Sequence, residues 1–369
     1  MAGPLPESAI AQDDGYITYR PYLEIGGRAG GAAEVGQGTL FVPLYQTNED
    51  LFFADLRGLT SDQQTVEGNW GLGFRKMIDQ SYIVGGYAFY DLRRSHYNNN
   101  YEQATIGLEL LTVDYDFRIN GYIPGNTGPM TAAPLSTATV SNGSIVVNGG
   151  FERAYYGSDF EVGMLLAEWD EGLEELRGYI GGYAFDNDAP GFESMIGPRA
   201  RVELRIYELD MLGADSRVVL GGEYQYDQVR GSQASAMASV RVAFGPGGQG
   251  RWLNRLHRRM LNPIVRDIDV VTNAITSPVA EAAKFSNGTP IGTVGVINAL
   301  TVDPETVLTD LGDNSIAIFD GSEGTITQQI DTFQMNNGQF VIGGGSSIQV
   351  VSCDTGSVAT LTVPGIRPL

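Results

Sequence analysis

Only two histidines, His96 and His257, could serve as imidazole bases in this 369-residue sequence. Ser95 directly precedes His96, but no third group is apparent that would orient the imidazole for nucleophilic catalysis. His257 lies among arginines, whose positive charge disfavours its protonated form. The sequence also lacks zinc-ligand spacing and the glycine loop of a phosphate site. We therefore expect no catalytic residues, no metal and no cofactor.

Acidic residues and a single cysteine are the remaining candidates for chemistry near the C-terminus. The acids at 303–305 and 310–313 do not have the spacing of an EF-hand, so we expect solvated loop acids there. Cys353 is the only cysteine, which excludes an intrachain disulfide. We expect it to be a small buried apolar residue rather than a reactive thiol.

The basic residues gather in one short segment of an acidic chain. The formal charge is -21, from 23 Lys+Arg and 44 Asp+Glu, which argues against a nucleic-acid partner. The clustered arginines are Arg251, Arg255, Arg258, Arg259 and Arg266. The first four have helical spacing that puts them largely on one side, and Pro263 would end the helix. Such a helix could lie on anionic lipid headgroups or inside an acidic pore.

The elements that would surround this helix are strands of alternating polarity. In 114–123, Tyr115, Phe117 and Ile119 share one face and oppose charged residues on the other. The same alternation occurs in 66–75, 200–206, 217–227 and 236–244. A soluble sandwich or barrel is the alternative, with its apolar face inward. Arginine and glutamate alternating on one face suit a water-filled lumen better, and aromatic strand ends suit a membrane interface.

Twelve strands are predicted in this way, and no stretch is apolar and long enough for a transmembrane helix. The strands lie near 19–29, 37–45, 50–59, 66–77, 81–92, 102–111, 114–123, 155–169, 174–186, 196–209, 216–229 and 234–245. An even number fits a bacterial outer-membrane barrel with short periplasmic turns. A periplasmic N-terminus places the polar insertion 124–154 outside, where we expect an exposed loop. The basic segment follows the last strand closely.

Several sequence motifs occur in the order known from one family. They are Thr39–Gln46, Leu51–Gly58, Gly68–Arg75, Gly86–Asp91 and Asn120–Pro124. Together they resemble the inverse autotransporters (type Ve secretion, intimin/invasin-like) over roughly residues 17–270. The resemblance implies a twelve-stranded antiparallel outer-membrane barrel whose chain re-enters the pore and displays a C-terminal passenger. The final part of this sequence shows no immunoglobulin-like repeats, so host-cell adhesion does not follow from the resemblance.

The chain is therefore expected to be all-β, with an internal plug helix and a small β-rich passenger start. We predict an N-terminal periplasmic segment (1–16), the barrel (17–246), a pore-threading helix and linker (247–287) and the passenger (288–369). Short β runs in the last segment resemble the first coils of a parallel β-helix. Residues 1–4 show no signal-peptide pattern, so an export signal is expected to have been removed.

The predicted function is to anchor the chain and to export and display its own C-terminal segment, for adhesion or another surface interaction. We expect as partners outer-membrane lipid, the insertion machinery with periplasmic chaperones, and an unknown surface ligand. The alternative is a porin-like channel with a periplasmic C-terminal domain. We also predict that Arg251, Arg255, Arg258 and Arg259 plug the pore. Of these, Arg255 and Arg259 would pair with Glu203, Glu223 or Asp227 on the lumen wall.

Overall fold

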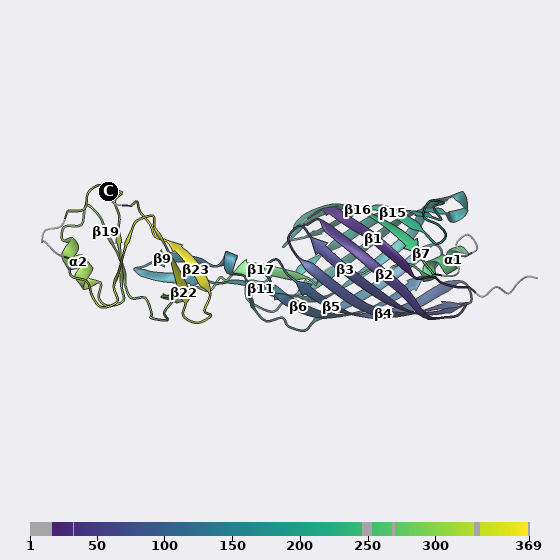
Figure 1. Cartoon of the computed structure of the whole chain (residues 1–369), viewed down its shortest axis with the longest axis horizontal. Coiled ribbons are helices and arrows are strands. Elements are labelled where there is room, and N and C mark those ends of the chain that lie inside the picture. Colours follow the sequence, from purple (N-terminus) through teal and green to yellow (C-terminus); the bar gives the residue numbers. More distant parts are fainter. Residues whose placement is uncertain (1–16, 32, 246–252, 268–269, 328–332, 368–369) are drawn as a thin grey trace, which may run out of the picture.

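The computed structural model describes residues 17–31, 33–245, 253–267, 270–327 and 333–367. It has two parts: a tilted β-barrel and a smaller unit near the C-terminus, joined by a narrow neck (Figure 1). No helix in the described ranges has the length and apolar character needed to cross a membrane. The predicted N-terminal segment 1–16 lies outside the described residues.

Twelve antiparallel strands close the barrel, with β1 paired to both β2 and β16. They are β1 (Tyr22–Gly30), β2 (Val35–Gln46), β3 (Asp50–Ser61), β4 (Val66–Ile78), β5 (Tyr82–Arg94), β6 (Asn100–Leu111), β7 (Tyr115–Pro124), β12 (Tyr156–Trp169), β13 (Glu174–Asp186), β14 (Met195–Tyr207), β15 (Arg217–Asp227) and β16 (Gly231–Ala243). A 3-10 turn, η2 (Asp170–Gly172), joins β12 to β13. The predicted fold class and all twelve barrel strands are confirmed.

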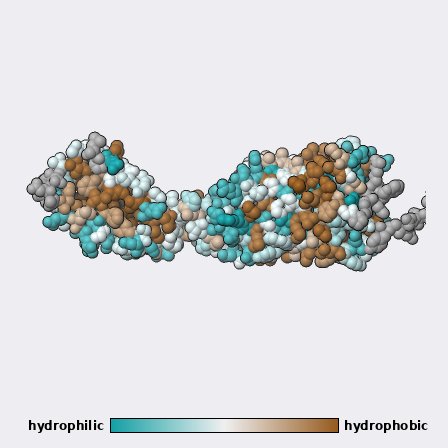
Figure 2. Space-filling model, viewed as in Figure 1, coloured by the Kyte–Doolittle hydropathy of each residue, from teal (hydrophilic) through white to brown (hydrophobic). Residues whose placement is uncertain are grey.

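The two faces of the barrel wall have opposite polarity. Outward residues include Leu108 and Ile180, which are 65% and 70% exposed, and Figure 2 shows an apolar belt over the strands between hydrophilic ends. Inward residues such as Arg75, Asp91 and Arg177 are fully buried. A soluble protein buries its apolar face and exposes its charges. This wall does the reverse, so the soluble alternative is excluded and the alternation predicted for the strands is confirmed.

After β16 the chain returns into the barrel as a short helix and an extended segment. Helix α1 (Arg255–Met260) is capped by Asn254, whose side chain accepts a hydrogen bond from His257 N at 2.8 Å. The helix ends before Pro263, as predicted, and Arg251 lies outside the described residues. Residues beyond the helix run through the lumen to the opposite end of the barrel. We call residues 261–267 the thread, and we name the two ends of the barrel the α1 end and the β17 end.

The unit beyond the β17 end contains strands from two distant parts of the sequence. The elements outside the barrel are β8 (Met130–Thr131), η1 (Ala133–Leu135), β9 (Thr137–Ser141), β10 (Ser144–Asn148), β11 (Gly150–Ala154), β17 (Thr272–Thr276), β18 (Glu281–Lys284), β19 (Val294–Ile297), α2 (Pro304–Asp310), β20 (Ile316–Phe319), β21 (Phe340–Gly343), β22 (Ser347–Ser352) and β23 (Val358–Thr362). They form three small sheets, with the orders β23-β22-β18-β10-β9, β17-β11-β8 and β19-β20-β21.

Three expectations for this region are corrected. The insertion 124–154 is not an exposed loop, because β8 to β11 form within it and pair with later strands. The predicted linker to residue 287 contains β17 and β18. The resemblance to a β-helix holds only for β19, β20 and β21, which pair in parallel, since the five-stranded sheet includes antiparallel pairs. Strands β11 and β10 also pair with β17 and β18, which lie far away in the sequence and leave little local signal, whereas β9 and β10 form a hairpin across Asn142 and Gly143.

Candidate functional site: the occupied barrel lumen

The inward face of the barrel is a network of ion pairs. Arg75 Nε lies 2.6 Å from Glu109 Oε1, and both side chains are fully buried. Arg118 lies 3.0 Å from both Asp116 and Glu161. A buried charge without a partner is strongly destabilising, so this mutual pairing is what allows charged residues to line the lumen. The lumen is therefore a polar passage with fixed side chains.

Helix α1 contributes two arginines that differ in burial. Arg259 forms an ion pair with Asp116 in β7, and its Nη1 donates to Val113 O at 3.4 Å. Arg255 pairs with Glu168 in β12, with 3.2 Å between Nη1 and Oε1. The Arg259 pair is buried, with 4% and 0% side-chain exposure, whereas the Arg255 pair is 31% and 39% exposed. The first pair therefore lies inside the lumen and the second at its rim.

Glu203, Glu223 and Asp227 are the predicted partners of α1, but the structure gives these carboxylates other contacts. They bind arginines of the wall: Glu203 binds Arg201 and Arg205, Glu223 binds Arg28, and Asp227 binds Arg230. Asp227 is the last residue of β15, which places it at the β17 end, far from α1. Of the predicted plug residues, Arg255 and Arg259 contact wall carboxylates, and Arg258 lies 5.0 Å from the Tyr207 ring centroid.

An apolar collar surrounds the thread at the α1 end. Leu253, Leu256, Met260, Leu261 and Ile264 are buried in one cluster with inward aromatic and aliphatic residues of the wall. The wall residues are Tyr19, Tyr22, Phe41, Leu51, Phe53, Met77, Ile83, Tyr87, Phe89 and Leu111. Apolar packing excludes water between the helix and the wall. The arginine spacing of this segment does not indicate the collar; the sequence signal for it is the leucines between the arginines.

Side chains of the wall bind the backbone at the last residue of α1 and along the thread. Arg75 Nη1 donates to Met260 O and to Asn262 O, both at 2.7 Å, and Arg57 Nη2 donates to Ile264 O at 2.9 Å. Two further wall donors are Arg241, bound to Leu261 O at 2.9 Å, and Asn120, bound to Val265 O at 3.2 Å. The thread makes no strand pairs, so these donors satisfy carbonyls that would otherwise be unpaired. The contacts do not depend on the thread's side chains.

Two charged side chains hold the thread nearer the β17 end. Arg266 Nη2 lies 2.8 Å from Asp91 Oδ1, and both side chains are buried. Asp267 Oδ2 lies 2.7 Å from Arg199 Nη2. The chain then leaves the lumen as β17, which pairs with β11 of the long insertion. The segment is therefore bound along the whole length of the passage and at both of its ends.

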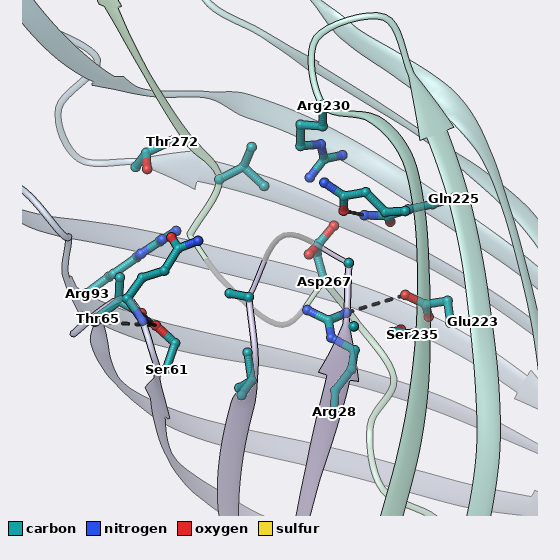
Figure 3. Close-up of a pocket in the computed structure, with 17 residues that line it drawn as sticks. Arg28, Ser61, Thr65, Arg93, Glu223, Gln225, Arg230, Ser235, Asp267 and Thr272 are labelled. Atoms are coloured by element: carbon teal, nitrogen blue, oxygen red, sulfur yellow. Dashed lines mark hydrogen bonds and ion pairs between the residues drawn. The ribbon is translucent and has the colours of Figure 1, made fainter. Parts of the chain in front are cut away.

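Two cavities remain beside the thread, against β1, β2 and the strands from β14 to β16. The first, of about 180 Å³, is lined by Arg28, Glu223, Arg230 and Asp267 at the β17 end, where Arg28 points toward Glu223 (Figure 3). The second, of about 190 Å³, adjoins it and shares Arg28 and Glu223 in its lining. The apolar collar lies between these cavities and the α1 end, so the lumen is only partly filled.

The residues considered for catalysis make other contacts. Ser95 Oγ donates to Glu152 Oε2 at 2.6 Å, and His96 Nδ1 lies 3.0 Å from Gln63 O. His257 Nδ1 lies 2.8 Å from Asn254 Oδ1 within α1. Within the described part of the chain, no group of three or more His, Cys, Asp or Glu residues is arranged to hold a metal ion.

One protein family and several solved structures are similar to this barrel. The model of the inverse autotransporter β-domain family matches residues 18–173. A solved structure from a study of the in-meso crystallization of membrane proteins matches with TM-score 0.51 and 16% identity, over 69% of this chain and 100% of that chain. The β-domain of the Bordetella autotransporter BrkA matches with TM-score 0.32 and 11% identity, over 61% and 99% of the two chains. An outer membrane channel from Pseudomonas putida F1 matches with TM-score 0.41 and 9% identity, over 62% of this chain and 97% of that chain. No curated protein matches the sequence.

Proposed function

We propose that this barrel, whose residues 18–173 match the inverse autotransporter β-domain family, carries the C-terminal segment through its own lumen and displays it at the cell surface. The barrel is an outer-membrane anchor that contacts lipid through its apolar outer face. Its assembly would require the outer-membrane insertion machinery and periplasmic chaperones, as for other such barrels. The unit beyond β17 is the passenger, and its contact with an unidentified surface ligand would serve adhesion or another surface interaction.

The observation that carries this proposal is the path of residues 255–267 and 270–276, which are bound inside the barrel and at its β17 end. Arg259 pairs with the wall at the α1 end, Arg266 pairs with Asp91 further along the lumen, and β17 pairs with β11 outside it. A chain held along this path has its two ends on opposite sides of the membrane. A porin-like channel with a periplasmic C-terminal domain needs an open lumen, which the collar around α1 opposes.

The connections between strands support a direction for the display. Strands meet at the α1 end through short turns such as 47–49, 79–81 and 112–114, whereas the insertion 125–155 lies at the β17 end. Outer-membrane barrels have short periplasmic turns and longer extracellular loops. We therefore assign the α1 end to the periplasm and the β17 end, with the passenger, to the exterior.

Surface accessibility on intact cells tests this assignment. The chain is expressed behind a signal peptide with a tag at its C-terminus, and a control variant carries the tag at Gly213 in the turn 208–216 of the α1 end, where the structure leaves open space. The C-terminal tag should bind antibody on intact cells, and the Gly213 tag only after permeabilisation. If the C-terminal tag also requires permeabilisation, the proposal fails and the porin-like channel is favoured.

A further inference from the structure

The insertion between β7 and β12 extends from the barrel into the passenger. Strands β9 and β10 lie at one edge of the five-stranded sheet, and β10 pairs with β18, the first strand of this sheet that follows the thread in the sequence. Figure 1 shows β9, β22 and β23 in the distal unit, on the far side of the neck formed by β11 and β17. One sheet of the passenger is therefore built partly from a loop of the barrel.

The insertion and the emerging chain form a nearly continuous antiparallel ribbon. The ribbon begins next to the barrel with Ala154 opposite Thr272 and ends within the sheet with Val146 opposite Ala282. Between the two paired stretches, the N–H of Ser277 donates to a carbonyl of the insertion at 2.7 Å. The residues of the emerging chain nearest the barrel thus pair with the residues of the insertion nearest the barrel, and each later residue pairs further out.

Two glycines, Gly149 and Gly150, lie where the insertion leaves the sheet strand β10 and enters the neck strand β11. A Cβ on Gly150 would lie 2.2 Å from Ala132 O, a backbone atom that cannot move without disturbing the insertion. A Cβ on Gly149 would lie 2.5 Å from Ser357 Oγ in the passenger. Glycine is required where two chain segments approach this closely. Gly150 is therefore needed for the fold of the insertion itself, and Gly149 lies where the insertion approaches a passenger side chain.

The insertion also supplies part of the passenger's hydrophobic core. Ile145 and Val147 are 3% and 0% exposed and belong to the same buried cluster as Ile316, Val350 and Leu361. Removing the insertion would expose these passenger residues to water and would leave β18 without its partner on one side. An unpaired strand edge beside an open apolar face favours unfolding or aggregation. The passenger fold is therefore incomplete without the barrel loop.

We propose that the insertion 125–155 is a folding template for the exported segment. This inference rests on the proposed export function, and it adds a second task for the barrel beyond anchoring and translocation. The insertion is attached to the barrel rim through β7 and β12, so each residue that leaves the lumen can meet its pairing partner in the order of the ribbon. Pairing also opposes return of the chain into the lumen, because the strand hydrogen bonds and the apolar contacts would have to break first.

The test is a pair of matched variants in the full-length chain on intact cells. Ile145→Asp/Val147→Asp places two carboxylates in the core face of β10, whereas Thr137→Asp/Thr139→Asp places them on the exposed face of β9. We expect the core variant to show a C-terminal tag at the surface but a passenger that added protease digests about a hundredfold faster, because opening becomes the dominant state. The exposed-face variant should keep wild-type resistance. Equal resistance in the two variants would overturn the template.

Two further measurements separate this inference from its premise. Barrel folding is followed by heat-dependent gel mobility, which should be unchanged in both variants. Cysteines at Val146 and Ala282, in a Cys353→Ser background, should form a disulfide across the ribbon on intact cells, since these residues lie opposite each other. A surface-exposed tag without this disulfide contradicts the template alone. A wild-type tag that is never exposed contradicts the export function itself.

Discussion

Arg259 and Arg255 lie one helical turn apart, yet they differ in how strongly they hold α1 in the lumen. The Arg259–Asp116 pair is almost fully buried, whereas the Arg255–Glu168 pair is about one third exposed. We expect Arg259→Gln to weaken the plug by about 1.5–3 kcal/mol, the usual contribution of a hydrogen bond to a charged group. Arg255→Gln should change the free energy that holds α1 in the lumen by less than about 1 kcal/mol, because solvent screens the exposed pair.

Conductance in planar bilayers measures this difference. Openings of the barrel should become about ten to a hundred times more frequent in the Arg259→Gln variant, as the free energy above implies. The Arg255→Gln variant is the matched control and should resemble the wild type. Equal behaviour of the two variants would show that the collar, and not the ion pair, holds the helix in place.

Residue types were easier to predict from the sequence than residue partners. The helical spacing of Arg255 and Arg259 and the stop at Pro263 could be read directly, and the helix forms there. The partners of these arginines could not be predicted, because the carboxylate that faces each arginine depends on the position of α1 along the barrel axis. Asp116 is the second residue of β7, next to the turn at the α1 end, so a search limited to inward acids near that end would have included it.

Glu281 in β18 predicts a pH dependence for the passenger. Partial burial alone would raise its pKa, but hydrogen bonds from the backbone and hydroxyl groups of Thr355, both at 3.0 Å, and from Ser352 lower the pKa below its ordinary value. A lowered pKa stabilises the fold above the unfolded-state pKa of about 4.3, and this stability is lost as the pH falls further. Protease resistance of the displayed passenger should therefore decrease below about pH 4. Glu281→Gln should flatten this dependence, and an unchanged profile would contradict it.

At the level of elements, the outward face of each strand must match the lipid. Leu108 in β6 is 65% exposed and lies between Gly86 and Ile119 on the neighbouring strands. An arginine near the bilayer midplane costs about 2–4 kcal/mol in such barrels. We therefore expect Leu108→Arg to lower the urea midpoint for unfolding from liposomes, and Leu108→Ala to lower it much less. Similar midpoints for both would mean that this face does not contact the hydrocarbon.

The same contrast explains which elements could be predicted. Barrel strands have one face in lipid and one in a polar lumen, so their alternation is strong and local, and all twelve were found. The strands within 124–154 have no such contrast until the passenger covers them. Val147, for example, is fully buried only because residues more than a hundred positions later pack against it. Sequence separation of this kind is not visible in a window of ten residues.

At the level of the whole molecule, the segment that follows β16 is held by three different kinds of contact. The collar is apolar, the middle of the thread is held by wall arginines through its backbone, and β17 pairs with the insertion outside. The thread is therefore expected to stay in place whether or not the passenger beyond it is folded. This independence distinguishes a structural plug from a segment that is merely held outside by a folded passenger.

Two truncations test this independence. A chain that ends after Ser277 keeps α1, the thread and the β17–β11 pairs, so its barrel should remain as closed in planar bilayers as the full-length protein. A chain that ends after Gly245 loses all of these contacts. Arg75, Arg57 and Asp91 would then face water, which should fill the lumen and give a stable open channel. High conductance of the chain that ends after Ser277 would mean that the passenger, and not the thread, closes the pore.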